Sequence, residues 1–210
     1  MPLNLTSSST CISSAEIMAK YSDSYLKKSS KSTSNTFSSQ NELINPDADV
    51  EERLSKMVTL FAYIDDKDIF QKHYARLLAK RLIFGSSASD DMESVLISKL
   101  KLACGYEFTS KLQRMFTDSS VSLDLSKDFC EFVKNSAVSL GVDFQAQVLT
   151  QGSWPITGAL GGDFQIPQEL EKPVDLFQTF YMGKHSGRKL TWLWSFSKGT
   201  TSALLVFSMR

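Results

Sequence analysis

Three amphipathic helical patterns follow one another between residues 65 and 118, and they constrain the fold of this chain more than any other feature. In the first, apolar residues recur every three or four positions from Phe70 to Leu82, which places them on one helix face. The second follows Ser89, a helix-capping residue type, and ends before Gly105. Apolar faces joined by short loops can be buried only against one another or another helix, so the pattern predicts a helical bundle. The residues expected to be buried are Phe70, Leu78, Leu82, Leu96, Leu100, Leu112 and Phe116.

Flanking segments extend this bundle to five or six helices. Residues 15–28 predict a helix whose apolar face holds Ile17, Tyr21 and Tyr25, and a separate helix is predicted at residues 124–135. Runs of Ser, Thr and Asn predict segments without regular structure. The predicted organisation is a disordered tail at residues 1–14, a helical bundle at 15–140 with a mobile loop at 29–45, and a truncated α/β region at 141–210.

Beyond residue 141 the apolar period changes from that of a helix to that of a strand. Alternation at residues 142–149 and again at 190–196 predicts two half-buried strands. Between them a helix is expected to begin at Pro167 and to be interrupted, or restarted, at Pro173. The end of the chain predicts poor order or a short edge strand at 203–207. The predicted fold class is mainly α: a helical bundle followed by a small, truncated α/β (α+β) sheet region.

Composition excludes several classes of function. Lys plus Arg and Asp plus Glu both number 23, so the formal net charge is zero and favours neither nucleic-acid nor membrane binding. The longest apolar run, at 203–207, is too short to span a bilayer. Three cysteines without framework spacing indicate a reduced setting. We therefore expect a cytoplasmic or nuclear protein with no signal peptide.

Candidate chemical groups have simpler structural explanations. His73 and His185 have no Cys or Asp neighbours at metal-ligand spacing, so no metal site is predicted. No phosphate-binding loop or nucleophile motif is present, and neither a cofactor nor a catalytic residue is expected. A basic column on the helix predicted around residues 70–82 consists of Lys72, Arg76 and Lys80, with Arg81 nearby. The column indicates a solvated face or a surface for an acidic partner.

Several stretches carry a resemblance to a known family. They read DDKDIFQKHYARLLAKRL at residues 65–82, SDDMESVLISKLKLACGYEFTSKLQRMFTD at 89–118, QVLTQGSWP at 147–155 and HSGRKLTWLW at 185–194. Together they resemble the cullins, the scaffolds of multi-subunit ubiquitin ligases, across residues 15–198. IPQELEKPVDLFQTFY at 166–181 is most similar to the cullin subfamily that uses elongin adaptors.

The resemblance implies a partner and a binding mode. In cullins the N-terminal strand of a RING-box protein joins the sheet that follows the helical bundle, a form of strand addition. Aromatic residues in this region fill a core or anchor an interface, and both interpretations stay open. Which sheet edge would receive the strand is also open. The partner-binding residues that the resemblance implies are Phe144, Val148, Trp154, Leu190, Trp192 and Trp194.

Two functions remain as alternatives. The first is a non-catalytic scaffold fragment of a cullin–RING ubiquitin ligase that acts in ubiquitin-dependent protein catabolism. It would bind a RING-box protein and could also bind other ligase components. The second is a helical interaction module without ligase activity, the product of an aberrant, truncated cullin. By the resemblance, the N-terminal adaptor-binding repeats and the C-terminal segment with the neddylation lysine are expected to be absent. Capture of a RING-box protein would distinguish the two.

Overall fold

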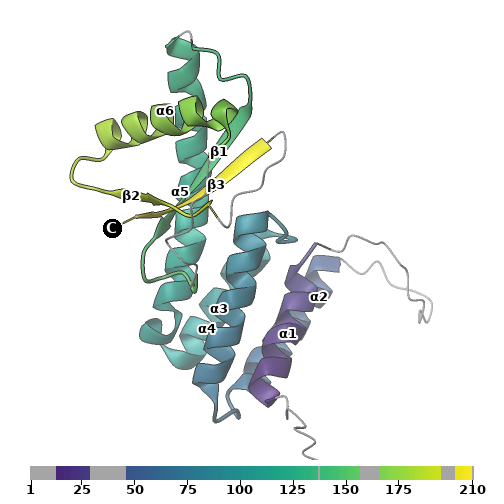
Figure 1. Ribbon diagram of the computed structural model, residues 1–210. Helices are drawn as coiled ribbons and strands as arrows, with labels where there is room; N and C mark the ends of the chain where they lie inside the picture. The colour runs from purple at the N-terminus through teal and green to yellow at the C-terminus, as the bar shows by residue number, and fades with distance from the viewer. Residues whose placement is uncertain (1–12, 29–45, 137, 157–165, 195–201, 210) are drawn as a thin grey trace, which may run out of the picture.

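The computed structural model describes residues 13–28, 46–136, 138–156, 166–194 and 202–209 (Figure 1). The predicted tail at 1–14 and loop at 29–45 therefore lie almost entirely outside the described residues. The mainly helical fold class is confirmed, with a helical part followed by a small sheet. The helices of the first part are α1 (Ser14–Leu26), α2 (Pro46–Phe61), α3 (Lys67–Phe84), α4 (Asp90–Cys104) and α5 (Tyr106–Asn135).

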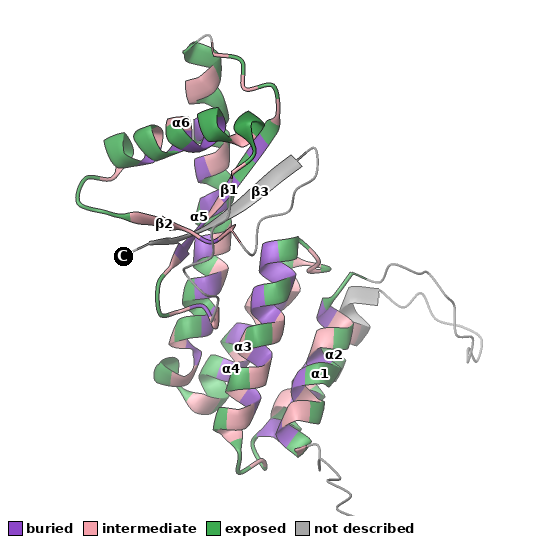
Figure 2. Ribbon diagram, viewed as in Figure 1, coloured by how far each residue is buried: buried purple, intermediate pink, exposed green. Residues whose placement is uncertain are grey.

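The helical part is held together by one core, which we call the first core. It contains Phe61, Phe70, Leu78, Leu96 and Leu112 with their buried neighbours. Local signals start and stop the helices: the Ser89 hydroxyl accepts from the Met92 amide, and Gly85 ends α3 at φ +59°. Figure 2 shows the buried residues on the facing sides of α1, α3 and α4. Of the seven residues predicted to be buried, six are buried and Phe116 is half-buried.

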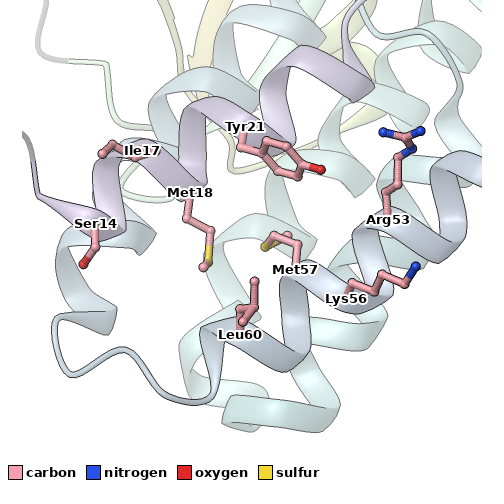
Figure 3. A pocket seen from close by; sticks show the side chains of 8 residues that line it. All are labelled: Ser14, Ile17, Met18, Tyr21, Arg53, Lys56, Met57 and Leu60. Carbon is pink, nitrogen blue, oxygen red and sulfur yellow. The ribbon is translucent and has the colours of Figure 1, made fainter. Parts of the chain in front are cut away.

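The predicted apolar face of α1 is not the face that enters the core. Ala15, Ala19 and Leu26 are buried, whereas Ile17 is 56% exposed and Tyr21 is 42% exposed. Small residues on the buried side let α1 pack against α3, with which it makes most of its contacts. The larger apolar side chains are left on the surface beside α2 (Figure 3).

The helix predicted separately at residues 124–135 is the second half of α5, which is 30 residues long. The sequence has no Gly or Pro between Tyr106 and Asn135, so nothing in the backbone forces a break. The polar stretch in the middle resembles a linker by composition. In the structure this stretch is helical, and its serine side chains form hydrogen bonds. The Ser122 hydroxyl, for example, lies 2.7 Å from the Asp118 carbonyl oxygen one turn earlier.

A three-stranded sheet lies against the second half of α5. The strand order is β1–β3–β2, with β3 parallel to β1 and antiparallel to β2. The expectation of poor order or an edge strand at 203–207 was wrong, because β3 covers that stretch and is the central strand. A continuous apolar run is typical of a strand with neighbours on both sides. The bounds are β1 (Asp143–Thr150), α6 (Gln168–Lys184), β2 (Leu190–Trp192) and β3 (Ser202–Met209).

A second core joins α5, β1 and α6. It is built mainly of aromatic rings, with Phe129 5.1 Å from Phe177 and 5.6 Å from Phe144 between ring centroids. The predicted interruption at Pro173 does not occur, because α6 continues through this buried residue. β2 is shorter than the predicted strand at 190–196, whose last two residues lie outside the described part.

Candidate partner-binding site

The outer edge of β1 is closed by a column of polar side chains on α5. Asp118, Ser122 and Ser126 recur every four residues on one helix face. The Val148 amide donates to the Ser122 hydroxyl at 2.9 Å, and the Ser126 hydroxyl lies 3.2 Å from the Ala146 carbonyl oxygen. We call Asp118, Ser122 and Ser126 the polar column. Alternate β1 residues find their backbone partners there, so this edge is not available for another strand.

Asp118 anchors one end of the polar column. Its carboxylate is 5% exposed and accepts from the Thr150 amide at 2.8 Å and the Thr150 hydroxyl at 2.9 Å. The indole N–H of Trp154 donates to the same carboxylate at 2.9 Å, and Arg114 pairs with it at 3.2 Å. A buried carboxylate needs such donors to offset its lost hydration. Asp118 therefore fixes both the end of β1 and the position of Trp154.

β2 lies at the opposite end of the sheet, and no strand beyond it is found among the described residues. Its Leu190 and Trp192 are half-buried, as is the nearby Trp194. The rings of Trp192 and Trp194 are stacked, with centroids 5.1 Å apart and an interplanar angle of 8°. These side chains pack against the second core while leaving part of their surface accessible. Among the described residues, β2 is thus the end strand of the sheet that lies away from the polar column.

The six residues predicted to bind a partner divide into two groups. Phe144 and Val148 are buried in the second core, and Trp154 is buried in the first core beside Asp118. Their side chains act in packing, the alternative that the sequence left open. Leu190, Trp192 and Trp194 are brought together at the β2 edge. These three are half-buried and lie in or next to β2, an end strand of the sheet among the described residues.

A buried charged cluster was missed by sequence reasoning. Arg81, expected beside the exposed basic column, is 1% exposed and donates through Nε to Glu93 at 2.6 Å and through a terminal nitrogen at 2.9 Å. Asp23 of α1 pairs with the same guanidinium, and the Tyr74 hydroxyl lies 3.3 Å from Glu93. The helical period could have predicted the burial of Arg81, because Arg81 shares one helix face with the apolar residues Tyr74 and Leu78.

The electrostatics of this cluster follow from its burial. Burial by itself lowers the pKa of Arg81, but the hydrogen bond to Glu93 and the adjacent carboxylates outweigh it, so the pKa is raised overall. Burial, followed by the Glu93 charge, raises the pKa of the Tyr74 hydroxyl well above its ordinary value. The cluster joins α1, α3 and α4 and holds no exposed reactive group. Its arrangement is that of a structural element.

A second surface feature is a groove between α1 and α2, shown in Figure 3. Ile17, Met18, Met57 and Leu60 line it, and the cationic side chain of Arg53 lies on the α2 side. Its volume is about 340 Å³. The exposed apolar face of α1 noted above forms one wall, so this is an apolar surface outside the sheet.

Neither histidine shows the surroundings of a metal ligand. His73 lies 3.9 Å from Glu16, and the His185 ring lies 4.7 Å from the Tyr181 ring between centroids. Among the described residues, no group of three or more His, Cys, Asp or Glu side chains could hold a metal ion. Cys104 and Cys130 are free thiols. None of the described helices has the length and apolar character needed to cross a membrane.

Comparisons with known proteins agree with this geometry. A family model described as the Cullin alpha solenoid domain matches residues 3–126, and one described as the Cullin alpha+beta domain matches residues 148–206. Cullin-1 of Dictyostelium discoideum is 45% identical over 188 residues, which are 89% of this chain and 23% of that protein. Cullin-2 of Caenorhabditis elegans is 42% identical over 201 residues, covering 88% and 24% respectively. Cullin-1 of Schizosaccharomyces pombe is 44% identical over 191 residues, covering 90% of this chain and 23% of that protein.

The chain spans about a quarter of the length of these relatives. With more than half of its residues matched by one family model, the chain belongs to the cullin family.

Proposed function

We propose that this chain forms part of the scaffold of a cullin–RING ubiquitin ligase and that its sheet binds a RING-box protein at the β2 edge. Membership of the cullin family supports the scaffold role, and the similarity of the sheet region to that of cullins supports the partner. The predicted closeness to the elongin-adaptor subfamily stays a prediction. We also propose that the protein acts inside the cell, in the cytoplasm or nucleus, in ubiquitin-dependent protein catabolism.

The observation that carries the choice of edge is the difference between the two ends of the sheet. At β1 the polar column already satisfies backbone groups of alternate residues. β2 is an end strand of the sheet among the described residues, and an end strand is a template for an extended peptide. Leu190, Trp192 and Trp194 would supply apolar contacts for alternate side chains of that peptide. A RING-box strand therefore fits β2 better than β1.

A scaffold of this kind needs no catalytic residue of its own. In the proposed ligase its contribution is proximity, because it holds the RING-box protein and its charged conjugating enzyme at a fixed distance from a substrate. The buried charged cluster and the polar column serve that role by making the helical part and the sheet one packed unit. Their buried members, Arg81, Glu93, Asp118 and Ser122, are hydrogen-bonded within the structure.

Co-expression of the full chain with a RING-box protein tests this proposal. We expect a single complex in gel filtration, with slower amide exchange at Leu190–Trp192 in the complex than in the free chain. The double variant Trp192→Ala/Trp194→Ala should lose the complex. Tyr63→Ala removes an 83% exposed aromatic side chain in the helical part and should leave it intact.

Circular dichroism of both variants separates lost binding from lost folding. A folded parent chain that captures no RING-box protein would overturn the scaffold proposal and favour the alternative of an interaction module without ligase activity. A third outcome is capture of the RING-box protein with unchanged amide exchange at β2 and slower exchange at β1. That result would support the RING-box protein as the partner but show that it binds the β1 edge.

A further inference from the structure

A basic pocket lies between α3, α5 and the segment that follows β1. Its volume is about 380 Å³. Lys72 and Arg76 extend from successive turns of α3, and Lys111 extends from α5, which packs beside it. The pocket is on the helical part and does not include β2. It therefore concerns a different surface from the proposed RING-box site.

The three cations of this pocket have no acidic partners in the described part of the chain. Lys72, Arg76 and Lys111 are all exposed, and no carboxylate of the described residues pairs with any of them. Some other exposed cations are paired, as Lys20 is with Glu16 and Lys56 with Glu52. Three unpaired positive charges around one hollow produce a local positive potential on a chain with no net charge.

The floor of the pocket is apolar and rigid. Leu112 is fully buried and Trp154 is 8% exposed. Because the indole N–H of Trp154 already donates to Asp118, the ring offers the pocket apolar surface and no free donor. The adjoining turn contains Gly152 at φ +84°, a conformation that other residues rarely adopt. The floor is thus held in place before any partner arrives.

We propose that this pocket binds a segment of another protein in which acidic residues flank one apolar side chain. The apolar side chain would lie on the accessible apolar lining, Ala75, Pro155 and Trp154, and the flanking carboxylates would pair with the three cations of the pocket. The basic column seen in the sequence thereby has a role through Lys72 and Arg76, while Lys80 lies outside the pocket.

The apolar floor favours such a peptide over a free anion. A phosphate group is held by donors that converge on it, and its desolvation against Ala75, Trp154 and Pro155 would be unfavourable. An acidic segment keeps its carboxylates at the solvated rim and buries only an apolar group. Charge complementarity would accelerate association and select against basic segments.

A labelled peptide and the full chain provide the test. The probe is a short fluorescein-labelled peptide with two glutamates on each side of a leucine, measured by fluorescence anisotropy. Lys72→Glu/Arg76→Glu should weaken binding by roughly tenfold or more, since both changes replace attraction by repulsion. The control Lys80→Glu/Lys127→Glu makes the same change in net charge at one position of α3 and one of α5, both outside the pocket, and should change affinity less than about twofold.

Two further readouts separate the pocket from general charge attraction. Replacing the leucine of the probe by serine should weaken binding, and the probe should shift the indole N–H signal of Trp154, assigned with Trp154→Phe. Equal weakening by both charge-reversal pairs, equal binding of the serine peptide, or displacement by inorganic phosphate at matched ionic strength would each overturn the proposal. Binding that requires only the leucine, and is insensitive to salt, would overturn its electrostatic part.

Discussion

The two cores of this protein are built from different chemistry. The first core is largely aliphatic and surrounds the buried charged cluster of Arg81, Glu93 and Asp23. The second core surrounds a group of aromatic rings around Phe129 and Phe177 and contains no charged side chain among its buried members. Directional bonds between named partners link α3 to α1 and to α4. Ring shape and area determine the packing of α6 against β1.

The charged cluster of the first core contributes mainly to the specificity of packing, and the aromatic second core contributes mainly to stability. A buried ion pair gains little net free energy over an apolar pair of the same size, but losing one partner leaves an uncompensated charge. An aromatic core gains stability in proportion to buried area and fails through cavities. The first core should therefore respond to substitution in an all-or-none manner set by partner identity, and the second in a graded manner set by side-chain volume.

The largest expected effect is the loss of Arg81. Arg81→Met should lower the free energy of unfolding by about 3–5 kcal/mol, because Glu93 would remain buried without its cation. Chemical denaturation followed by circular dichroism measures the change. The double variant Arg81→Met/Glu93→Leu removes both charges and should recover most of the loss. If the double variant were as unstable as the single one, the cluster would matter for its shape and not for its charges.

Phe177→Ala should come next, with a loss of about 3 kcal/mol, the lower end of the range for removing a buried aromatic ring. Its ring contacts Phe129, Phe144 and Phe180, and the half-buried Phe180 can move to fill part of the cavity. Phe177→Leu should retain more stability than Phe177→Ala. Equal losses for the two variants would contradict a graded response in the second core.

A smaller effect is expected where the two regions join. Ser122→Ala leaves the Val148 amide without its acceptor and should cost about 1–3 kcal/mol. Ser126→Ala removes a bond to a carbonyl oxygen and should cost less, since carbonyls have other ways to be satisfied. Hydrogen exchange of the Val148 amide reports the change directly. Unchanged protection of that amide in Ser122→Ala would show that the polar column does not close the β1 edge.

The smallest expected effect is a pH dependence confined to the second region. Burial, followed by the charges of Arg188 and Lys184, lowers the pKa of His185 below its ordinary value of 6.5. The folded state therefore favours the neutral imidazole more than the unfolded state does. The stabilising contribution is present above pH 6.5 and is lost as the pH falls through the lower folded-state pKa. An NMR titration of the His185 ring should show this, and a pKa at or above 6.5 would contradict it.

Local patterns predicted the helices well, while contacts between distant segments were beyond them. Phe70 and Leu96 were identified as core residues because a helical period fixes their face without knowledge of any partner. Arg81 was misassigned because its burial depends on Asp23, 58 residues earlier in the chain. The central position of β3 likewise depends on pairing with β1 across many intervening residues. The partner-binding role of Trp192 and Trp194 stays a prediction, and the sequence could not choose between the sheet edges, because the polar column is a tertiary feature.

The length of α5 has a consequence for how this protein could transmit geometry. A continuous helix of 30 residues is about 45 Å long, and its first half belongs to one core while its second half belongs to the other. It acts as a stiff spacer that fixes the distance from the α1–α2 end to the sheet. A kink introduced by proline near the exposed Ser120 would alter that distance and would also disturb the polar column at Asp118 and Ser122. If the chain forms the proposed scaffold, the distance between the partners it holds would then depend on the straightness of α5.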